Sequence, residues 1–502
     1  VPSHGWQEAV YQLIDIDRAP IQLVKDDNGQ DLKISVELGH RTVYARIWRV
    51  NVGRNPLYLL DTDVDDNDPW DRELSARLYS GDSEMRIRQE IMLGIGGVRA
   101  LHKLDIEPAA WHMNEGHSAF LLLENVRKKV VEGLNFDEAV DLVRKNSVFT
   151  THTPVPAGHD AFSYHLLDQY FANYWDEMKV SREKFLSLGA HKEEWGQAFN
   201  MTVLALHLAE KTNGVSKLHG EVSREMWQPV WPELDVTRIP ITSVTNGVHV
   251  PTWISSELNM LLSKYLGADW CDRHDDPIMW QRIVDVPAEE LWDVHMLLKF
   301  KLMRYLRAKA RRSWVGGQSD PTQVLTSGTM LDPEALTIGF ARRFATYKRA
   351  TLIFRDAERL KKLLLDIHRP VQIVFAGKAH PADDPGKALI QEIYNMAKHN
   401  QLGGRIAFVE DYDMHVARYF TQGVDVWLNT PRRPHEASGT SGMKASLNGV
   451  PNLSVLDGWW VEGYNGANGW AINGEQLDDH GAQDHHDVEA IYRLLEEEIV
   501  PL

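Results

Sequence analysis

The second half of the chain alternates between short apolar runs and amphipathic segments. The apolar runs have the length of buried strands, and the segments between them carry apolar residues at helical spacing. The predicted strands are 336–340, 371–376, 405–409, 424–428 and 453–456, and the predicted helices are 356–367, 386–399, 415–421 and 436–447. This alternation predicts βαβ units, and therefore a parallel sheet that helices cover.

The first half has a more mixed pattern. Its predicted elements are strands at 43–52 and 57–60 and helices at 84–104 and 136–145. The cluster Gly94-Ile95-Gly96-Gly97 lies inside the first of these helices, where close helix packing is the favoured interpretation.

Two stretches of the second half show neither the apolar runs of strands nor the helical spacing of apolar residues. We interpret 314–335 as a linker or insertion and 465–486 as a loose acidic loop. His485 and His486 in the second stretch could bind metal. Without further spaced ligands, however, a solvated loop is favoured.

The most specific segment for chemistry is 436–444, with the sequence Glu-Ala-Ser-Gly-Thr-Ser-Gly-Met-Lys. In parallel sheets ligands bind outside the carboxyl ends of strands, and this segment follows one. Its glycines leave backbone N–H groups open to an anion, although the spacing of a Walker loop is absent. A phosphate cradle beside Lys444 is what pyridoxal phosphate requires. A surface lysine after a helix start of small residues carries about equal weight.

A basic segment follows the first strand of the alternating region. It contains Arg342, Arg343, Lys348 and Arg349. At the carboxyl end of a strand such residues can hold more than one phosphate, because arginine offers bidentate contacts and lysine a point charge. The alternative is a solvated basic turn, which is less favoured in a chain of strong negative charge.

Two further loops, 111–117 and 151–156, read as polar walls of a site. The first resembles a metal-binding motif at a glance. His112 and His117 are five residues apart, however, whereas a helical zinc pair needs a spacing of four. We therefore expect no metal site.

The composition narrows the classes of function. The chain has 502 residues and a net charge of −17, which disfavours nucleic-acid and anionic-membrane binding. One cysteine, Cys271, allows no intrachain disulfide, and no apolar run approaches 18 residues. We expect a protein of the cytoplasm. The 17 tryptophans would suit sugar rings, but most could be core.

At these segments the chain closely resembles the α-glucan (glycogen/maltodextrin) phosphorylases, in particular their shorter bacterial and archaeal branch. The resemblance is dense over nearly the whole chain. It rests on segments 59–63, 86–90, 114–117, 151–154, 245–248, 342–349, 377–381 and 436–444.

The resemblance implies an α/β fold of two Rossmann-like domains of glycosyltransferase-B type, with the catalytic cleft between them. The expected domains are 1–255, on the glucan or acceptor side, and 256–502, which binds pyridoxal phosphate. The implied reaction is phosphorolysis of terminal α-1,4-linked glucose, giving α-glucose 1-phosphate with retained configuration. The implied partners are an α-glucan (glycogen, starch or maltodextrin) and inorganic phosphate, and the chain could form a homo-oligomer.

The family's functional residues carry over onto matching positions. By this resemblance Lys444 forms the Schiff base with pyridoxal phosphate, and Arg343 and Lys348 hold the substrate phosphate. The cofactor phosphate is expected at Arg342, Thr440, Ser441 and Gly442, with Trp253 and Tyr412 close to the cofactor. Glucose hydroxyls are expected at Glu436, Ser438 and Gly439, with Asn246 and His152 at the other edge and Glu115 and His117 on the acceptor side.

The chain also departs from the family's pattern. The Gly-rich loop near the family's start is not found, so the chain is expected to begin after that loop and to end before the family's final helices. Arg342 and Ala345 stand where the vertebrate branch has Lys and His. The alternatives are a sugar-nucleotide-dependent glycosyltransferase of the same architecture, an inactive glucan-binding fragment and an α-amylase-like hydrolase.

Overall fold

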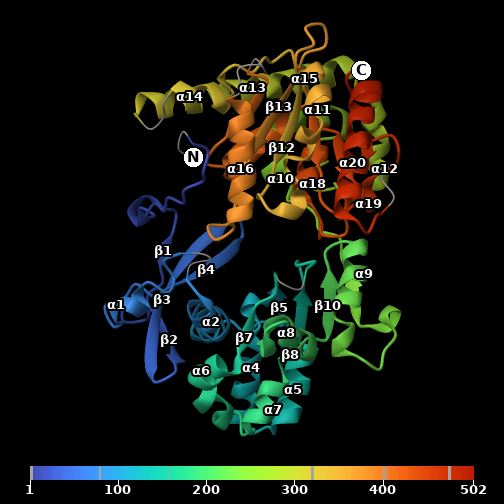
Figure 1. Cartoon of the computed structure of the whole chain (residues 1–502). Helices are drawn as coiled ribbons and strands as arrows, with labels where there is room; N and C mark the ends of the chain where they lie inside the picture. Colours follow the sequence, from blue (N-terminus) through green and yellow to red (C-terminus); the bar gives the residue numbers. More distant parts are fainter. Residues whose placement is uncertain are drawn as a thin grey trace. The chain divides into compact units, whose positions relative to one another are not determined.

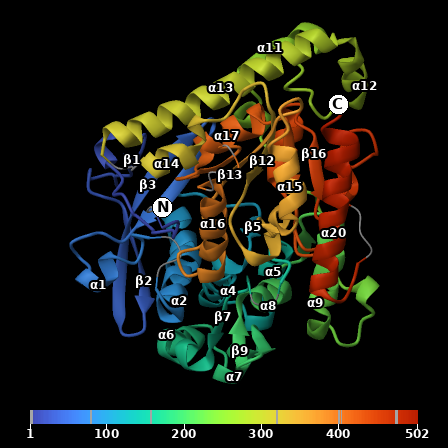
Figure 2. The same cartoon turned by 45° about the horizontal axis from the view of Figure 1, so that its top comes forward.

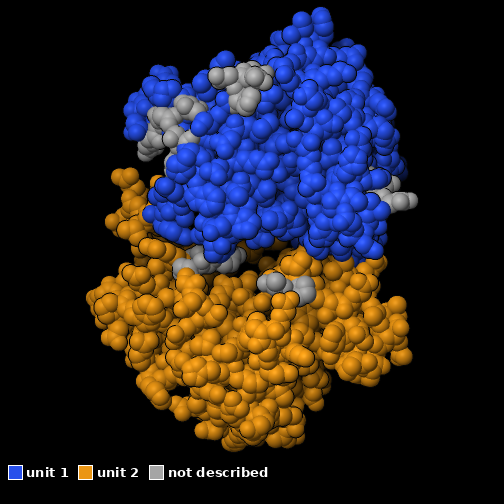
Figure 3. All heavy atoms as spheres, in the orientation of Figure 1, with its two compact units in different colours: residues 1–11, 216–218, 245–502 blue, residues 12–215, 219–244 orange. Residues whose placement is uncertain are grey.

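The chain folds into two compact units. The computed structural model describes residues 4–77, 81–155, 158–317, 321–398, 402, 404–472 and 476–502 (Figure 1). Unit 1 comprises residues 1–11, 216–218 and 245–502, and unit 2 comprises residues 12–215 and 219–244 (Figure 3). The expected domains 1–255 and 256–502 stay a prediction. Of the loop 151–156, Pro156 lies outside the described residues, as do residues 318–320 and 473–475 of the two stretches without a period.

Unit 1 is built on the predicted parallel sheet. Six strands run in the order β14-β13-β12-β15-β16-β17, and every neighbouring pair is parallel. The strands are β12 (Leu336–Ala341), β13 (Val371–Ala376), β14 (Ile406–Val409), β15 (Val426–Asn429), β16 (Asn452–Val455) and β17 (Gly469–Ile472). The five predicted strands are confirmed, and β17 adds a sixth at the edge.

Helices cover both faces of this sheet, as the alternation predicts. The helices of unit 1 are α10 (Val250–Trp253), α11 (Ser256–Leu266), α12 (Pro277–Trp280), α13 (Ala288–Val315), α14 (Pro321–Val324), α15 (Ala357–Leu364), α16 (Asp384–Ala397), α17 (Met414–Gly423), α18 (Thr440–Leu447), α19 (Trp460–Gly463) and α20 (His480–Leu494). Side chains of α15, α16 and α20 pack with Phe340 and Phe375 on one face. Side chains of α13 and α17 pack with Val374 and Trp427 on the other.

Three sequence interpretations in unit 1 need correction. The helix predicted at 436–447 begins at Thr440, so residues 436–439 form a loop. The stretch 465–486 is not one loose loop, because it contains β17 and the start of α20, where His485 and His486 lie. The stretch 314–335 contains α14 as well as the end of α13. Polar residues within these stretches hid the regular spacing of apolar residues from which helices and strands are predicted.

Unit 2 combines a parallel sheet with two antiparallel ones. The parallel sheet has the order β11-β10-β6-β5, and the antiparallel sheets are β1-β3-β2, with β4 on β3, and β7-β9-β8. The strands are β1 (Gln22–Leu23), β2 (Lys33–Leu38), β3 (Arg41–Val52), β4 (Asn55–Asp61), β5 (Trp111–Asn114), β6 (Ser147–Thr150), β7 (Ala161–Ser163), β8 (Ala190–Glu193), β9 (Gly196–Asn200), β10 (Lys211–Gly214) and β11 (Ile241–Ser243).

The helices of this half pack around one apolar core. They are α1 (Pro69–Arg72), α2 (Ser83–Ile91), α3 (Gly97–Lys103), α4 (Phe120–Val131), α5 (Phe136–Lys145), α6 (Tyr164–Glu177), α7 (Arg182–Ser187), α8 (Met201–Leu208) and α9 (Lys217–Met226). The helix predicted at 84–104 is confirmed as α2 and α3 joined by the π-helical turn η2 (Met92–Gly96). Close packing at Gly94 is also confirmed, because a Cβ there would lie 2.8 Å from the backbone nitrogen of Leu121.

Two sequence expectations concern the chain as a whole. Within the described ranges, no helix is long and apolar enough to cross a membrane. Cys271 is a free, half-buried thiol.

The carboxyl edge of the unit 1 sheet depends on a close backbone approach at Gly377. This residue follows β13 with φ +153°, and a Cβ there would lie 1.9 Å from the carbonyl oxygen of Arg342. The Arg342 N–H in turn donates to the carbonyl of Ala376 at 3.1 Å. Glycine is therefore required where the loops after β12 and β13 touch.

We expect Gly377→Ala to lower the free energy of unfolding by about 3 kcal/mol or more, because the methyl group displaces Arg342 and the backbone is strained. Urea unfolding measures this loss. Gly449 is the matched control: it has φ +76°, and a Cβ added there would meet nothing within 4 Å, so Gly449→Ala should cost only about 1 kcal/mol. Equal losses in the two variants would contradict the close approach.

Candidate active site

A buried carboxylate lies between two cations at the carboxyl edge of the unit 1 sheet. Arg342 follows β12, and Lys348 ends the short turn η9 (Thr346–Lys348). Glu436 lies in the loop after β15, the strand that pairs with β12. The Glu436 Oε2 atom is 2.7 Å from Arg342 Nη2 and 3.1 Å from Lys348 Nζ. The sheet thus brings together three of the predicted site residues.

All three side chains are shielded from water. Their exposed fractions are 5% for Arg342, 9% for Lys348 and 10% for Glu436. Burial alone would raise the pKa of the Glu436 carboxyl, but the positive charges of Arg342 and Lys348 lower that pKa to about 2. Glu436 is therefore ionised throughout the neutral range, and the cluster carries one net positive charge.

A second carboxyl group, that of Asp457, contacts the backbone of Glu436. The Glu436 N–H donates to Asp457 Oδ2 at 2.9 Å, and the Gly458 N–H donates to Asp457 Oδ1 at 2.8 Å. Burial raises the pKa of Asp457 to about 7, and the nearby negative charge of Glu436 also raises it. Sequence reasoning missed Asp457, because no motif marked the loop after β16.

The glycine-rich segment 436–444 and Arg342, which follows β12, both have polar atoms without protein partners. Arg342 Nη1, Ser438 Oγ and Ser441 Oγ are buried and have no hydrogen-bond partner in the described part of the chain. Gly439 precedes α18 with φ +87°, and a Cβ at Gly442 would lie 2.6 Å from Asn452 Oδ1. Unsatisfied buried donors are costly, so this set fits an anion with several acceptor oxygens, such as a phosphate group.

Lys444 points its amine at an aromatic face. Its Nζ atom lies 3.9 Å from the ring centroid of Trp253, and burial lowers the pKa of the amine. Asn448 Nδ2 donates to the carbonyls of both Lys444 and Trp253 at 2.9 Å, which fixes α10 against α18. A partly desolvated lysine is more nucleophilic toward a carbonyl group.

The other predicted residues of unit 1 have different surroundings. Tyr412 is half-buried; burial raises the pKa of its phenol to about 12, and the charge of Arg342 acts on it in the opposite direction. Thr440 opens α18, and Asn246 is half-buried before α10. Arg343 is exposed and makes none of the contacts of the buried cluster.

Arg349, the third arginine of the basic segment, does not belong to the phosphate-binding set suggested by the sequence. It is buried, and its guanidinium lies 2.9 Å from Asp484 and 2.6 Å from Asp487, both on α20. It also donates to the carbonyls of Thr430 and Pro431 at 2.9 Å. These acidic partners lie more than 130 residues away, so local sequence could not show them.

Two predicted residues, Glu115 and His152, form one network in unit 2. The Glu115 carboxylate accepts hydrogen bonds from the N–H of His152 at 2.7 Å and from Thr153 Oγ1 at 2.9 Å. His152 Nε2 contacts Asn114 Oδ1, and burial lowers the pKa of the imidazole. Glu115 has φ +75°, a strained value for this residue type that clusters at functional sites.

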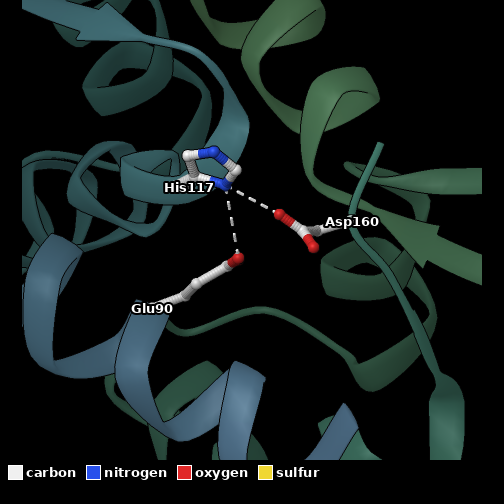
Figure 4. Close-up of side chains that lie close together, drawn as sticks. All are labelled: Glu90, His117 and Asp160. Carbon is white, nitrogen blue, oxygen red and sulfur yellow. Dashed lines mark hydrogen bonds and ion pairs between the residues drawn. The ribbon is translucent and has the colours of Figure 1, made fainter. Parts of the chain in front are cut away.

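His117 belongs to a second charged cluster of unit 2 (Figure 4). Its Nδ1 atom is 2.8 Å from Asp160 Oδ2 and 3.8 Å from Glu90 Oε1. The hydrogen bond to Asp160 and the nearby Glu90 carboxyl raise the pKa of His117 to about 9, and burial raises the pKa of Glu90 to about 8. Sequence reasoning missed Glu90 and Asp160 as site residues, because they lie far apart along the chain.

Glu90, His117 and Asp160 are arranged so that they could hold a metal ion. The guanidinium of Arg86 already places a positive charge beside these carboxyl groups: its Nε atom is 3.0 Å from Glu90 and its Nη2 atom is 3.2 Å from Asp160. A further cation would be repelled by the guanidinium. We therefore interpret the cluster as an ion-pair network around His117.

A family comparison agrees with this geometry. The model of the family described as carbohydrate phosphorylase matches residues 96–491, which is more than half of the chain. The chain belongs to the carbohydrate phosphorylase family. The match includes the Glu436 cluster, Lys444 and the loops that carry Glu115, His117 and His152.

Curated members of the phosphorylase family resemble the chain along its whole length. A glycogen phosphorylase of Aquifex aeolicus is 47% identical over 99% of this chain and 71% of its own length. A maltodextrin phosphorylase of Thermococcus litoralis is 45% identical over 100% of this chain, and a glycogen phosphorylase of Mycobacterium tuberculosis is 44% identical over 99%. The chain spans 59% of the length of each of these two proteins.

The network around His117 predicts a loss of stability at alkaline pH. The folded pKa values of His117 and Glu90 lie above their ordinary values of 6.5 and 4.5, so the folded state binds more protons than the unfolded one. The His117 contribution is fully present below pH 6.5 and is lost as the pH rises through about 9. We expect the melting temperature to fall by a few degrees over this range.

Glu90→Gln should flatten this fall, because glutamine keeps the side chain neutral at every pH. Thermal melts across the range measure the slope. Glu225, an exposed glutamate of α9, provides the control, and Glu225→Gln should keep the parental slope. A Glu90→Gln protein with the parental slope would show that the buried carboxyl does not titrate in this window.

Proposed function

We propose that the chain is an α-glucan phosphorylase that releases terminal α-1,4-linked glucose from glycogen or maltodextrin as α-glucose 1-phosphate. The observation that carries this proposal is the buried Arg342–Glu436–Lys348 cluster, together with the unpartnered Arg342 Nη1 and Ser441 Oγ and with Lys444, which lies on α18 three residues after Ser441. Such a set suits two phosphate groups and a lysine-bound cofactor. The names of the similar phosphorylases support the same conclusion.

The cofactor that these residues fit is pyridoxal phosphate. Lys444 would hold its aldehyde carbon, with Trp253 and Tyr412 close by. Arg342 Nη1, Ser441 Oγ, Thr440 and the backbone at Gly442 would hold its phosphate. When bound, this phosphate supplies an anion that can share a proton with a neighbouring phosphate.

The substrate phosphate would lie with Lys348 and Arg343. In the proposed reaction a proton passes from this phosphate to the departing glycosidic oxygen, while the bond from that oxygen to C1 of the glucose breaks. A phosphate oxygen then forms the new bond to C1 on the same face, which retains the configuration. The role of Lys348 is to hold the phosphate by point charge, and that of Arg343 is to add contacts from the exposed side.

Glucose recognition would involve neutral and negative groups of the same loops. Glu436, Ser438 and Gly439 would bind glucose hydroxyls, with Asn246 and His152 at the other edge of the sugar. Glu115 and His117 would line the acceptor side of the glucan. A phosphate on Lys348 would compete with Glu436 for the same cation, which would free the carboxylate to accept hydrogen bonds from the sugar.

A sugar-nucleotide-dependent glycosyltransferase is the competing proposal. Those enzymes commonly place a second glutamate eight residues after the first, where it holds the donor ribose. Position 444 is lysine here, with its pKa lowered by burial, which favours the cofactor of a phosphorylase.

We expect Lys444→Ala to abolish binding of pyridoxal phosphate, because the substitution removes the amine that would bond to its aldehyde carbon. The measurement is the pyridoxal phosphate content of the purified protein after incubation with the cofactor. Lys361, an exposed lysine of α15, is the control, and Lys361→Ala should bind the parental amount. A parental protein that takes up no cofactor would refute the assignment.

Lys348→Ala should retain the cofactor but lose phosphorolysis by at least about a hundredfold, because the substrate phosphate loses its main point charge. Phosphate-dependent release of glucose 1-phosphate from maltodextrin measures this loss. Sugar release without phosphate would indicate a hydrolase instead. Glucan binding without any release in the parent would indicate an inactive glucan-binding protein.

Glu436→Gln should bind inorganic phosphate several times more tightly while its phosphorolysis falls. The substitution removes the carboxylate that competes with phosphate for Arg342 and Lys348. It also weakens the hydrogen bonds to the glucose hydroxyls. Equilibrium dialysis with labelled phosphate separates binding from turnover. Glu462, a half-buried glutamate that contacts Thr245, is the control, because Glu462→Gln leaves the two cations paired. Weaker phosphate binding in Glu436→Gln would contradict this account.

A further inference from the structure

An open cavity of about 1280 Å³ lies on unit 1. Its walls come from α13, from α17 and from the start of α11, and α13 is the long helix that runs along the top of Figure 2. None of its described lining residues belongs to the Arg342–Glu436–Lys348 cluster or to segment 436–444. Its cationic lining residues are Lys301, Arg304, Arg307, Arg311, Arg312 and Arg418.

The cations arise from helical spacing on two packed helices. Lys301, Arg304 and Arg311 recur along one face of α13 at intervals of three and seven residues. Arg418 faces the same cavity from α17, which packs against α13. Two helices therefore place positive side chains around one cavity. A row of solvent-exposed cations without a binding role would be expected on a single helix.

Only part of this charge is compensated. Lys301 pairs with Glu257, and Arg307 donates to the carbonyl of Leu331 at 2.8 Å. Arg304, Arg311, Arg312 and Arg418 are exposed, and the described part of the chain gives them no carboxylate partner. Besides Glu257, which lines the cavity, Asp411 and Asp413 lie nearby: Asp411 accepts a hydrogen bond from Lys309 through its backbone carbonyl, and both aspartates act on the pKa of Tyr305. In a chain of net charge −17, this concentration of unpaired arginine is unusual.

An aromatic group forms part of the same cavity. The rings of Tyr305 and Tyr419 stack at 4.3 Å and 12°, and His415 meets Tyr419 edge-on at 5.2 Å. All three side chains line the cavity. Tyr305 lies on α13 and Tyr419 on α17, so the stacked pair joins the two helices that carry the cations.

We propose that this cavity binds a compact ligand that carries two or more phosphate groups. Arg304 and Arg311 of α13 would take one phosphate and Arg418 of α17 another, with the tyrosine pair between them. Arginine suits this task, because its planar fork binds phosphate oxygens in pairs. A long nucleic acid fits less well, because the rest of the acidic chain would repel its extended backbone.

Isothermal titration calorimetry of the whole chain tests the proposal, with inorganic tripolyphosphate as the first probe. The triple variant Arg304→Gln, Arg311→Gln, Arg418→Gln should weaken tripolyphosphate binding by at least about tenfold, because three charge-assisted contacts are lost. The control triple variant Arg54→Gln, Arg238→Gln, Arg369→Gln removes the same charge from exposed positions elsewhere and should change affinity by less than about twofold. Titrations with fructose 1,6-bisphosphate and ATP then show whether the phosphates come best from an inorganic chain, a sugar or a nucleotide.

Lys348→Ala separates this cavity from the proposed active site. Tripolyphosphate should bind Lys348→Ala with parental affinity at the cavity. The proposal is overturned if no probe binds, if both triple variants weaken binding equally, or if Lys348→Ala alone abolishes it. Arg418→Gln by itself provides a milder variant. With an unchanged melting temperature, it should still weaken binding, and parental affinity in this variant would remove α17 from the site.

Discussion

The buried contact of Glu436 with Arg342 and Lys348 is the interaction on which the candidate active site depends. Removing two cations and a carboxylate from water is costly unless close ion pairs with good geometry offset that cost. The distances of 2.7 and 3.1 Å meet this condition. Because β12 and β15 are parallel neighbours, their following loops meet at one edge, and the charge cluster joins them there.

This cluster also sets the protonation of the groups around it. Glu436 stays ionised, so its negative charge adds to burial in raising the pKa of Asp457 to about 7. Among the described residues no carboxylate pairs with the Lys444 amine; burial lowers the pKa of that amine, and the Trp253 face stabilises its cationic form. One site thus holds a carboxylate that ionises readily, a carboxyl that resists ionisation and an amine that loses its proton more easily than an exposed lysine.

The sequence predicts the parts of this arrangement that repeat regularly or stand close together. The strands of the unit 1 sheet are visible as apolar runs, and segment 436–444 is visible as glycines beside a lysine. The helix of that segment starts later than its pattern indicates, because Ser438 and Gly439 continue the loop. Partners from distant segments cannot be read from local sequence. Arg349 stands among phosphate-binding candidates, yet Asp484 and Asp487 hold it in the fold, and Arg86, Glu90 and Asp160 meet at His117 only there.

Local compensation, rather than net charge, decides where this acidic chain can bind anions. Arg349 and Arg86 are held by carboxylates that stay with them in the fold, so they stabilise structure. Arg342 and Lys348 share one carboxylate, which leaves the cluster with a positive charge and a free donor on Arg342. Arg304 and Arg418 have no carboxylate partner among the described residues. Where the cations are already neutralised by carboxylates, the net negative charge of the surface repels phosphate and so disfavours anion binding.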